Sequence, residues 1–261
     1  MQKKYDQGNG FNYTLFPAKT EKPESLIVYL HGANDNAEIP TNYLRALQEK
    51  IPGADVIALQ APIKVIKSPR FPNPVGYNWF SFGGSILSQI ETWVTHIFKR
   101  LTIAEQIEAF TQAQLAKRGL TETNLAYYGY SMGGIVALQT GLSGEKPVAA
   151  IVSRGGTFLP FSRVKNNSKV FLQMGENDEK FNTPAPLPQK GFLKQVFAEV
   201  VSLRHVSSVR RLQAHKVSVT EKVYPKQGHE QNYSAWKEAV DFMAKALNKP
   251  TSLPQPKPPS I

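Results

Sequence analysis

A glycine-rich turn between an apolar run and a helix-forming run constrains the fold of this chain more than any other feature. Gly129-Tyr130-Ser131-Met132-Gly133 overlaps the end of the apolar run 124–130 and precedes the helix-forming residues 135–138. The five-residue pattern alone arises often by chance. A strand that enters it and a helix that leaves it, however, make a turn so tight that side chains beside the serine would clash. Such a turn holds the serine strained and exposed, near a helix N-terminus that favours developing negative charge. This context predicts Ser131 as a nucleophile.

A serine hydroxyl is a weak nucleophile unless a base accepts its proton, and the base needs an acid that orients it. Where such a turn carries a nucleophile, the acid and then the base follow the serine along the chain. Downstream of Ser131 the histidines are His205, His215 and His229. His205 and His215 lie in a basic, helix-like stretch, whereas His229 lies in the loop directly after the last apolar run. We therefore predict His229 as the base. Without a base and an acid to serve Ser131, the turn would be only a glycine-rich bend with no catalytic role.

The orienting acid has few candidates. Asp178 is the only aspartate between Ser131 and His229, and it follows the apolar run 169–174 within the segment Gly175–Asp178. We predict Asp178 as the acid. Glu176 and Glu179 remain alternatives, and Asp178 would otherwise only cap the segment that follows it.

Stabilising a developing oxyanion requires two backbone N–H groups that converge on it. Met132, directly after the nucleophile, is predicted to supply one. The second is expected from the loop after the apolar run 25–30, where Ala33 is our choice and Gly32 the neighbouring alternative. We expect His31 to hold this loop by a side-chain hydrogen bond. A metal-ligand role for it has little support, because no second cluster of ligand-type residues accompanies it.

Apolar runs of strand length alternate with longer helical patterns along the chain, which predicts an α/β fold with a mostly parallel central sheet flanked by helices on both faces. The predicted strands are Ser25–Leu30, Asp55–Gln60, Asn124–Tyr130, Val148–Ser153, Lys169–Met174 and Val217–Tyr224. The predicted helices are Ser85–Leu101, Thr102–Gly119 and Ser234–Leu247. We expect one domain over residues 1–249 and a proline-rich tail over residues 250–261, which cannot be helical.

Charge and composition narrow the partners. The net charge of +11 is compatible with contact with an anionic membrane surface, or simply with solvated basic faces. The basic stretches have no interleaved aromatic residues and no nucleic-acid motif, so we expect no nucleic-acid partner.

The chain has no cysteine, which removes disulfides, thiolate metal sites and cysteine nucleophiles. Residues 1–8 have no apolar segment typical of a signal peptide, so we expect a cytoplasmic location, or a periplasmic one if a leader has been removed.

Taken together, these motifs resemble the phospholipase/carboxylesterase family of α/β-hydrolases, which includes acyl-protein thioesterases. The matching segments run in the family's order, and they are Leu30–Asn36, Ala61-Pro62, Trp79-Phe80, Gly129–Gly134, Gly175–Asp178 and Gly228-His229. The resemblance implies the α/β-hydrolase fold, with Ser131, Asp178 and His229 as the catalytic triad. It also implies Ala33 and Met132 as the donors to the oxyanion.

Two departures from the family pattern bear on the substrate. Met132 stands where the family commonly has glutamine, and Lys180-Phe181-Asn182 replaces a valine-proline pair after the acid. The stretch between Asp178 and His229 is also longer than in compact members, and loops of this kind shape the acyl pocket.

Three aromatic residues, together with Met132, are our candidates for lining that pocket: Tyr77, Trp79 and Phe80. Core packing is the alternative reading for Trp79 and Phe80.

The expected function is a cofactor-independent serine hydrolase that cleaves short to medium acyl esters through an acyl-enzyme. The expected substrate is a small acyl ester or a lipid such as a lysophospholipid. Thioester hydrolysis, including that of acyl-proteins, is the main alternative. A serine peptidase and a non-catalytic binding module of the same fold are less favoured, because the chain has no room for a propeller or lid domain and retains all three triad residues.

Overall fold

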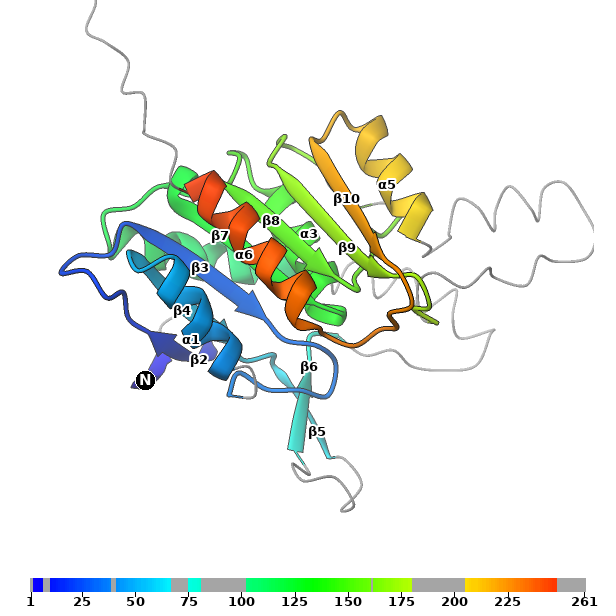
Figure 1. The fold of residues 1–261 in the computed structure, drawn as a ribbon. Helices are drawn as coiled ribbons and strands as arrows, with labels where there is room; N and C mark the ends of the chain where they lie inside the picture. The colour runs from blue at the N-terminus through cyan, green and yellow to red at the C-terminus, as the bar shows by residue number, and fades with distance from the viewer. Residues whose placement is uncertain are drawn as a thin grey trace, which may run out of the picture.

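The computed structural model describes residues 2–6, 10–38, 41–66, 75–80, 102–160, 162–179 and 205–247. An eight-stranded sheet in the order β1-β2-β4-β3-β7-β8-β9-β10 forms its centre (Figure 1). Its strands are β1 Gln2–Asp6, β2 Phe11–Phe16, β3 Ser25–Leu30, β4 Ala54–Leu59, β7 Leu125–Tyr130, β8 Ala150–Arg154, β9 Val170–Gly175 and β10 Val219–Tyr224. The six strands from β4 to β10 in this order pair in parallel, whereas β1 and β2 are antiparallel to their neighbours.

All six predicted strands are present at or near their predicted bounds, so the mostly parallel sheet is confirmed. The strand β3 shows why its sequence lacks polar alternation. Leu26, Val28 and Leu30 face one hydrophobic core, and Ile27 and Tyr29 face a second core on the other side of the sheet. A strand covered on both faces needs apolar residues at every position.

Helices cover both faces of the sheet. The helices α1 (Thr41–Lys50) and α6 (Tyr233–Leu247) pack on one face, which is the near side in Figure 1. The helix α3 (Met132–Ser143), the helical residues 102–116 and α5 (His205–Ala214) contribute to the core on the other face. The predictions for 102–119 and 234–247 are confirmed to within a few residues. The predicted helix 85–101 and the tail 250–261 lie outside the described residues.

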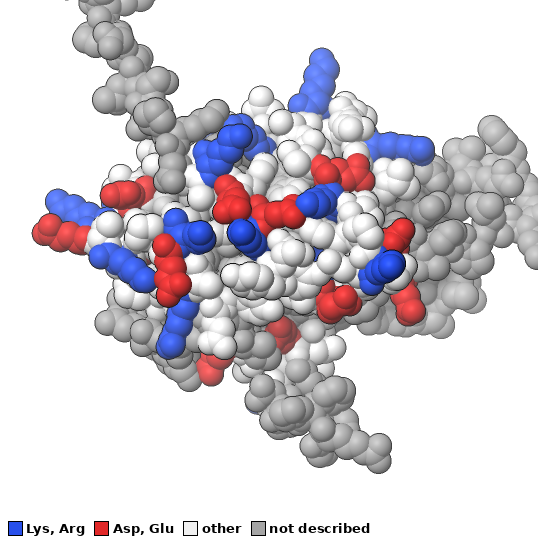
Figure 2. Space-filling view, in the orientation of Figure 1, with Lys and Arg blue, Asp and Glu red and all other residues white. Residues whose placement is uncertain are grey.

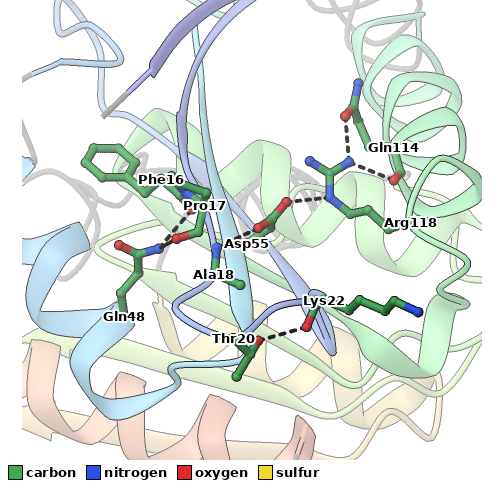
Figure 3. Close-up of polar contacts among 9 residues, drawn as sticks. All are labelled: Phe16, Pro17, Ala18, Thr20, Lys22, Gln48, Asp55, Gln114 and Arg118. Atoms are coloured by element: carbon green, nitrogen blue, oxygen red, sulfur yellow. Dashed lines mark hydrogen bonds and ion pairs between the residues drawn. The ribbon is translucent and has the colours of Figure 1, made fainter.

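A polar cluster ties several segments together at the amino ends of the parallel strands (Figure 3). Arg118 Nε donates to Asp55 Oδ2 at 2.7 Å, and the Ala18 N–H donates to Asp55 Oδ1 at 2.7 Å. Gln114 accepts hydrogen bonds from Arg118 through both its main-chain and its side-chain oxygen. Nearby, Gln48 Nε2 donates to the carbonyl of Phe16 at 2.9 Å. The cluster therefore braces the end of the sheet that lies away from Ser131.

A two-stranded ribbon extends from the body of the protein (Figure 1). It consists of β5 (Ile63–Ile66) and β6 (Val75–Asn78), which pair in antiparallel fashion. At its base the Tyr77 N–H donates to the carbonyl of Asp35 at 2.8 Å. The ribbon is thereby attached to the loop that follows β3.

Among the described helices, none has the length and apolar character needed to cross a membrane.

Candidate active site

Ser131 occupies a sharp turn between β7 and α3, as the sequence predicts. Its φ of 53° lies in the left-handed region, which is strained for a residue with a side chain. The flanking glycines make the turn sterically feasible. A Cβ on Gly129 would lie 2.2 Å from the carbonyl oxygen of Gly133, and a Cβ on Gly133 would lie 2.1 Å from that of Leu30. Only glycine fits where backbone approaches backbone this closely.

His229 lies between Ser131 and Asp178. Its Nε2 is 2.7 Å from Ser131 Oγ, and its Nδ1 is 2.7 Å from Asp178 Oδ2. An ionised carboxylate only accepts hydrogen bonds, so Nδ1 carries the proton and the Nε2 lone pair faces the serine hydroxyl. The Asp178 side chain is fully buried, and that of His229 is 15% exposed. A shielded carboxylate that holds a partly exposed imidazole is the arrangement required for base-assisted nucleophilic attack.

The three residues come together because they follow parallel strands in the same half of the sheet, where the order is β7-β8-β9-β10. Ser131 follows β7, Asp178 follows β9, and His229 follows β10. Tyr224 at the end of β10 is in register with Gly175 at the end of β9. The two loops that follow them are therefore adjacent, at the carboxyl edge of the sheet where α/β folds place their sites.

The alternative acids do not take the place of Asp178. Glu176 accepts the Lys226 N–H at 2.9 Å and so braces the loop that leads to His229. Glu179 is exposed to solvent. Among the three candidates, Asp178 is the one that the structure brings onto His229.

The alternative bases lie elsewhere. His205 is the first residue of α5 and is buried, with its Nε2 2.9 Å from Glu221 Oε1. Burial lowers the pKa of His205. His215 is exposed, just beyond the end of α5. Neither of them contacts Ser131.

His31 is a buried residue that organises the loop after β3. Its Nε2 accepts the Ala61 N–H at 3.1 Å, so its Nδ1 carries the proton and donates to the Gly32 carbonyl at 2.8 Å. Trp79 Nε1 donates to the His31 carbonyl at 2.8 Å. The imidazole therefore has the loop-holding role expected for it.

The predicted oxyanion donors are on two segments next to Ser131, the start of α3 and the loop after β3. Met132 is the first residue of α3, and N–H groups in the first turn of a helix have no partner within the helix. A Cβ on Gly32 would lie 3.5 Å from Ser131 Cβ, so the loop after β3 passes close to the nucleophile. Ala33 follows in that loop and is exposed. The roles of Met132 and Ala33 stay predictions.

The predicted pocket residues lie mainly in the core. Trp79 and Phe80 are 2% and 3% exposed and belong to the same core cluster as Met132, and the half-buried Tyr77 packs against that cluster. This burial agrees with the core-packing alternative for Trp79 and Phe80. A substrate-lining role for Tyr77, Trp79 and Phe80 stays a prediction.

Sequence reasoning missed three residues around His229. Gly155 has φ of 60°, and a Cβ there would lie 3.2 Å from His229 Cε1. The side chains of Arg154 and Tyr130 donate hydrogen bonds to the main chain around His229. The Gly-Gly pair at 155–156, one residue beyond the run 148–153, was the available signal for Gly155. No sequence pattern pointed to the other two residues.

No group of three or more histidine, cysteine, aspartate or glutamate side chains suited to a metal ion occurs in the part of the chain that the structure describes.

Comparison with known proteins places this chain in a family. The model of the phospholipase/carboxylesterase family matches residues 13–247. An uncharacterized hydrolase of Mycosarcoma maydis is 25% identical over 166 residues, which cover 62% of this chain and 60% of that protein. The chain thus matches less than two thirds of that relative's length.

Two solved structures share the fold at low sequence identity. Esterase PE8 is similar with a TM-score of 0.69 and 19% identity, over 91% of this chain and 99% of that one. A carboxylesterase from Mesorhizobium loti is similar with a TM-score of 0.61 and 16% identity, over 93% of this chain and 98% of that one. Together with the sheet order, they confirm the α/β-hydrolase fold. Because the family model matches nine tenths of its length, the chain belongs to the phospholipase/carboxylesterase family of α/β-hydrolases.

Proposed function

We propose that this protein is a serine carboxylic ester hydrolase in which Ser131 is the nucleophile, His229 the base and Asp178 the orienting acid. The observation that carries the proposal is the continuous hydrogen-bonded chain from Ser131 Oγ through His229 to Asp178, with both distances at 2.7 Å. Membership of a hydrolase family supports it independently of this geometry.

In the proposed acylation step, His229 Nε2 takes the proton of Ser131 Oγ while that oxygen attacks the acyl carbon of the ester. Asp178 holds the imidazole in the reactive tautomer and stabilises its positive charge. The tetrahedral intermediate collapses when the carbon–oxygen bond to the alcohol breaks, and His229 gives its proton to the departing oxygen. The product of this half-reaction is an acyl-enzyme.

Deacylation repeats the sequence with water as the nucleophile. His229 takes a proton from the water, which attacks the acyl carbon, and then returns a proton to Ser131 Oγ as the acid product leaves. In both halves the negative charge develops on the former carbonyl oxygen. The N–H groups of Met132 and Ala33 are proposed to stabilise it, since Met132 begins α3 and the loop carrying Ala33 passes beside Ser131.

Short to medium acyl esters are the proposed substrates, with lysophospholipids and thioesters, including those of acyl-proteins, as the alternatives. The names of two structural relatives, an esterase and a carboxylesterase, favour oxygen esters. A p-nitrophenyl ester series from acetate to palmitate would order the acyl lengths. Matched thioester and anilide substrates test the alternatives. Faster cleavage of the thioester than of every ester would identify a thioesterase, and faster cleavage of the anilide would identify a peptidase.

Covalent labelling tests the nucleophile directly. A fluorophosphonate probe should label the wild type and fail to label Ser131→Ala, because only an activated serine displaces the fluoride. Ser153→Ala is the matched control: Ser153 is a buried serine on the neighbouring strand β8, and its removal should leave labelling intact. A wild type that resists labelling would favour the non-catalytic binding module instead.

We further propose that the β5–β6 ribbon contacts anionic membrane surfaces. Ile66 on this ribbon is 81% exposed and Ile63 is 37% exposed. The segment 61–78 contains three basic residues and no acidic one. Exposed aliphatic side chains on a ribbon whose sequence is basic suit the interface of an anionic bilayer. The base of the ribbon adjoins the loop that carries Ala33, since Asn34 N–H donates to Asn78 Oδ1 at 2.7 Å, so a lipid substrate would meet the site at the membrane.

A further inference from the structure

The loop that carries His229 connects β10 to α6 and passes the carboxyl ends of the parallel strands (Figure 1). Side chains from the neighbouring strands β7 and β8 donate hydrogen bonds to the main-chain carbonyls at and next to His229. Tyr130 Oη donates to the His229 carbonyl at 2.9 Å. Arg154 Nη2 donates to the Glu230 carbonyl at 2.8 Å and lies 3.5 Å from the Gly228 carbonyl. Two side chains therefore hold the carbonyls of His229 and Glu230, and one of them also lies within reach of the Gly228 carbonyl.

Arg154 also contacts the nucleophile's backbone. It ends β8 and is in register with Tyr130, the last residue of β7. The Arg154 carbonyl accepts the Ser131 N–H at 2.8 Å. One residue thus holds the turn that carries Ser131 with its main chain and the loop that carries His229 with its side chain.

The burial of Arg154 needs an explanation beyond packing. The residue is 1% exposed, and its Nε and Nη1 have no hydrogen-bond partner among the described residues. A guanidinium stays charged in a protein interior, and a buried charge without full pairing is unfavourable. The ring of Tyr224, whose centroid is 5.4 Å from Arg154 Cζ, offers only partial compensation. An apolar side chain would fill this space at lower cost, but it would leave the loop carbonyls without donors.

Tyr130 contacts both the loop that carries His229 and the loop that follows β3. Besides the bond to the His229 carbonyl, its ring packs against the loop after β3, where a Cβ on Gly32 would lie 2.9 Å from Tyr130 Cδ1. Burial raises the pKa of Tyr130 to about 12, so its hydroxyl remains a donor throughout the physiological range. The Tyr130 ring also lies beside the His229 imidazole, with the ring centroids 5.6 Å apart. The hydrogen bonds that Tyr130 Oη and Arg154 Nη2 donate go to main-chain carbonyls of the His229 loop, which do not react in the proposed mechanism.

We propose that Arg154 and Tyr130 are positioning residues that set the distance between His229 Nε2 and Ser131 Oγ by fixing the main chain on either side of His229. This inference rests on the proposed role of Ser131 and His229. Proton transfer requires close approach of these two atoms. A variant whose His229 loop has lost the hydrogen bonds from Arg154 or Tyr130 should therefore bind substrate normally but turn it over slowly.

The test compares Arg154→Met, Arg154→Lys and Tyr130→Phe with the wild type in the hydrolysis of a short p-nitrophenyl ester. For Arg154→Met we expect kcat to fall about 10- to 100-fold, with KM unchanged to within about twofold. Tyr130→Phe removes one hydroxyl and should lower kcat by a smaller factor, in the range of about 3- to 10-fold. Arg154→Lys keeps the charge and a donor nitrogen and should recover part of the loss.

Arg118→Met is the matched control. Arg118 is also largely buried and binds Asp55 (Figure 3). Asp55 lies at the start of β4, whereas Ser131 follows the end of the parallel strand β7. Arg118→Met should lower the melting temperature and leave the kcat of the folded enzyme unchanged. If Arg154→Met and Tyr130→Phe likewise lost only thermal stability, both residues would be structural and the inference would be wrong. If Arg154→Met does not fold, Arg154→Lys and Tyr130→Phe decide the question by the same criterion.

A second readout does not depend on ester hydrolysis. The proton that His229 Nδ1 donates to Asp178 should give a low-field proton NMR signal in the wild type and in Arg118→Met. In Arg154→Met this signal should broaden or shift, because the imidazole is no longer held in place. An unchanged signal would overturn the inference even if the protein hydrolysed no ester, whereas a changed signal with no hydrolysis would count against the proposed function alone.

Discussion

Ser131 adopts its left-handed backbone conformation because β7 must reverse into α3 within a single residue. The sequence predicted this feature because it depends on neighbours in the chain. It predicted Asp178 because no other aspartate lies between Ser131 and His229. Gly155, Arg154 and Tyr130 were missed because their contacts with the His229 loop join residues about 75 to 100 positions apart. Such contacts become visible only once the strand order is known.

Replacing Gly155 with alanine should displace the His229 imidazole and so impair catalysis. The new Cβ would lie 3.2 Å and 3.3 Å from two atoms of the His229 imidazole, in a backbone conformation with φ of 60°. We expect kcat to fall about 10- to 100-fold, because a small displacement of the base is enough. Gly119→Ala is the matched control: φ there is 66°, but a Cβ would meet nothing within 4 Å. Equal kcat values for the two variants would show that the packing against His229 has no catalytic consequence.

His205 should make stability depend on pH. Burial lowers its folded-state pKa, against a weaker opposing effect of Glu221, so the unfolded chain binds the proton more readily. The stability contribution is therefore complete above the unfolded-state pKa of about 6.5 and is lost as the pH falls through the folded-state value. Melting temperatures of the wild type and of His205→Gln, measured between about pH 5 and 8, should show a smaller decrease at low pH in the variant. Parallel curves would exclude His205 as the source.

At the scale of elements, the buried parallel strands were predicted and the antiparallel ones were not. A strand covered on both faces is a continuous apolar run, and such runs stand out in the sequence. The ribbon strands β5 and β6 mix exposed and half-buried positions, so no such run marks them. The helix α1 was also missed, although Leu44, Leu47 and Ile51 recur at helical spacing and are buried.

Two glycines of α3 should differ in their tolerance of alanine. A Cβ on Gly133 would lie 2.1 Å from the carbonyl oxygen of Leu30, so β3 or α3 would have to move. A Cβ on Gly141 would meet the end of the Ile151 side chain at 2.4 Å, and that side chain can adjust. Gly133→Ala should therefore lower the free energy of unfolding by about 3 kcal/mol or more, and Gly141→Ala by about 1 kcal/mol. Urea denaturation measures both, and a reversed order would refute the packing argument.

At the scale of the whole molecule, the net charge of +11 does not produce a uniformly basic surface. Figure 2 shows Lys and Arg interspersed with Asp and Glu on the face that carries α6. Opposite charges in close proximity, such as Lys222 Nζ and Glu238 Oε1 at 2.6 Å, weaken the field of this face. We therefore expect membrane attraction to come from the local composition of the β5–β6 ribbon.

Vesicle binding tests that expectation. The wild type should bind vesicles that contain phosphatidylserine, and binding should weaken as salt is added because the attraction is partly electrostatic. Ile66→Asp should reduce binding, whereas Val206→Asp should not, since Val206 is an exposed aliphatic residue on α5 rather than on the ribbon. Co-sedimentation measures all three proteins. Equal vesicle binding by the two variants would show that the β5–β6 ribbon does not contact the membrane.

The central claim is that Ser131, His229 and Asp178 act as one unit. The most direct test measures kcat/KM on one ester for three single variants and for the variant that combines them. The single variants are Ser131→Ala, His229→Ala and Asp178→Asn. Removing either the nucleophile or the base should lower kcat/KM about 10⁴-fold or more, and the triple variant should be no worse than Ser131→Ala, because the unit fails when one member is lost. Losses that multiply across the three sites, or a Ser131→Ala variant within about tenfold of the wild type, would contradict the claim.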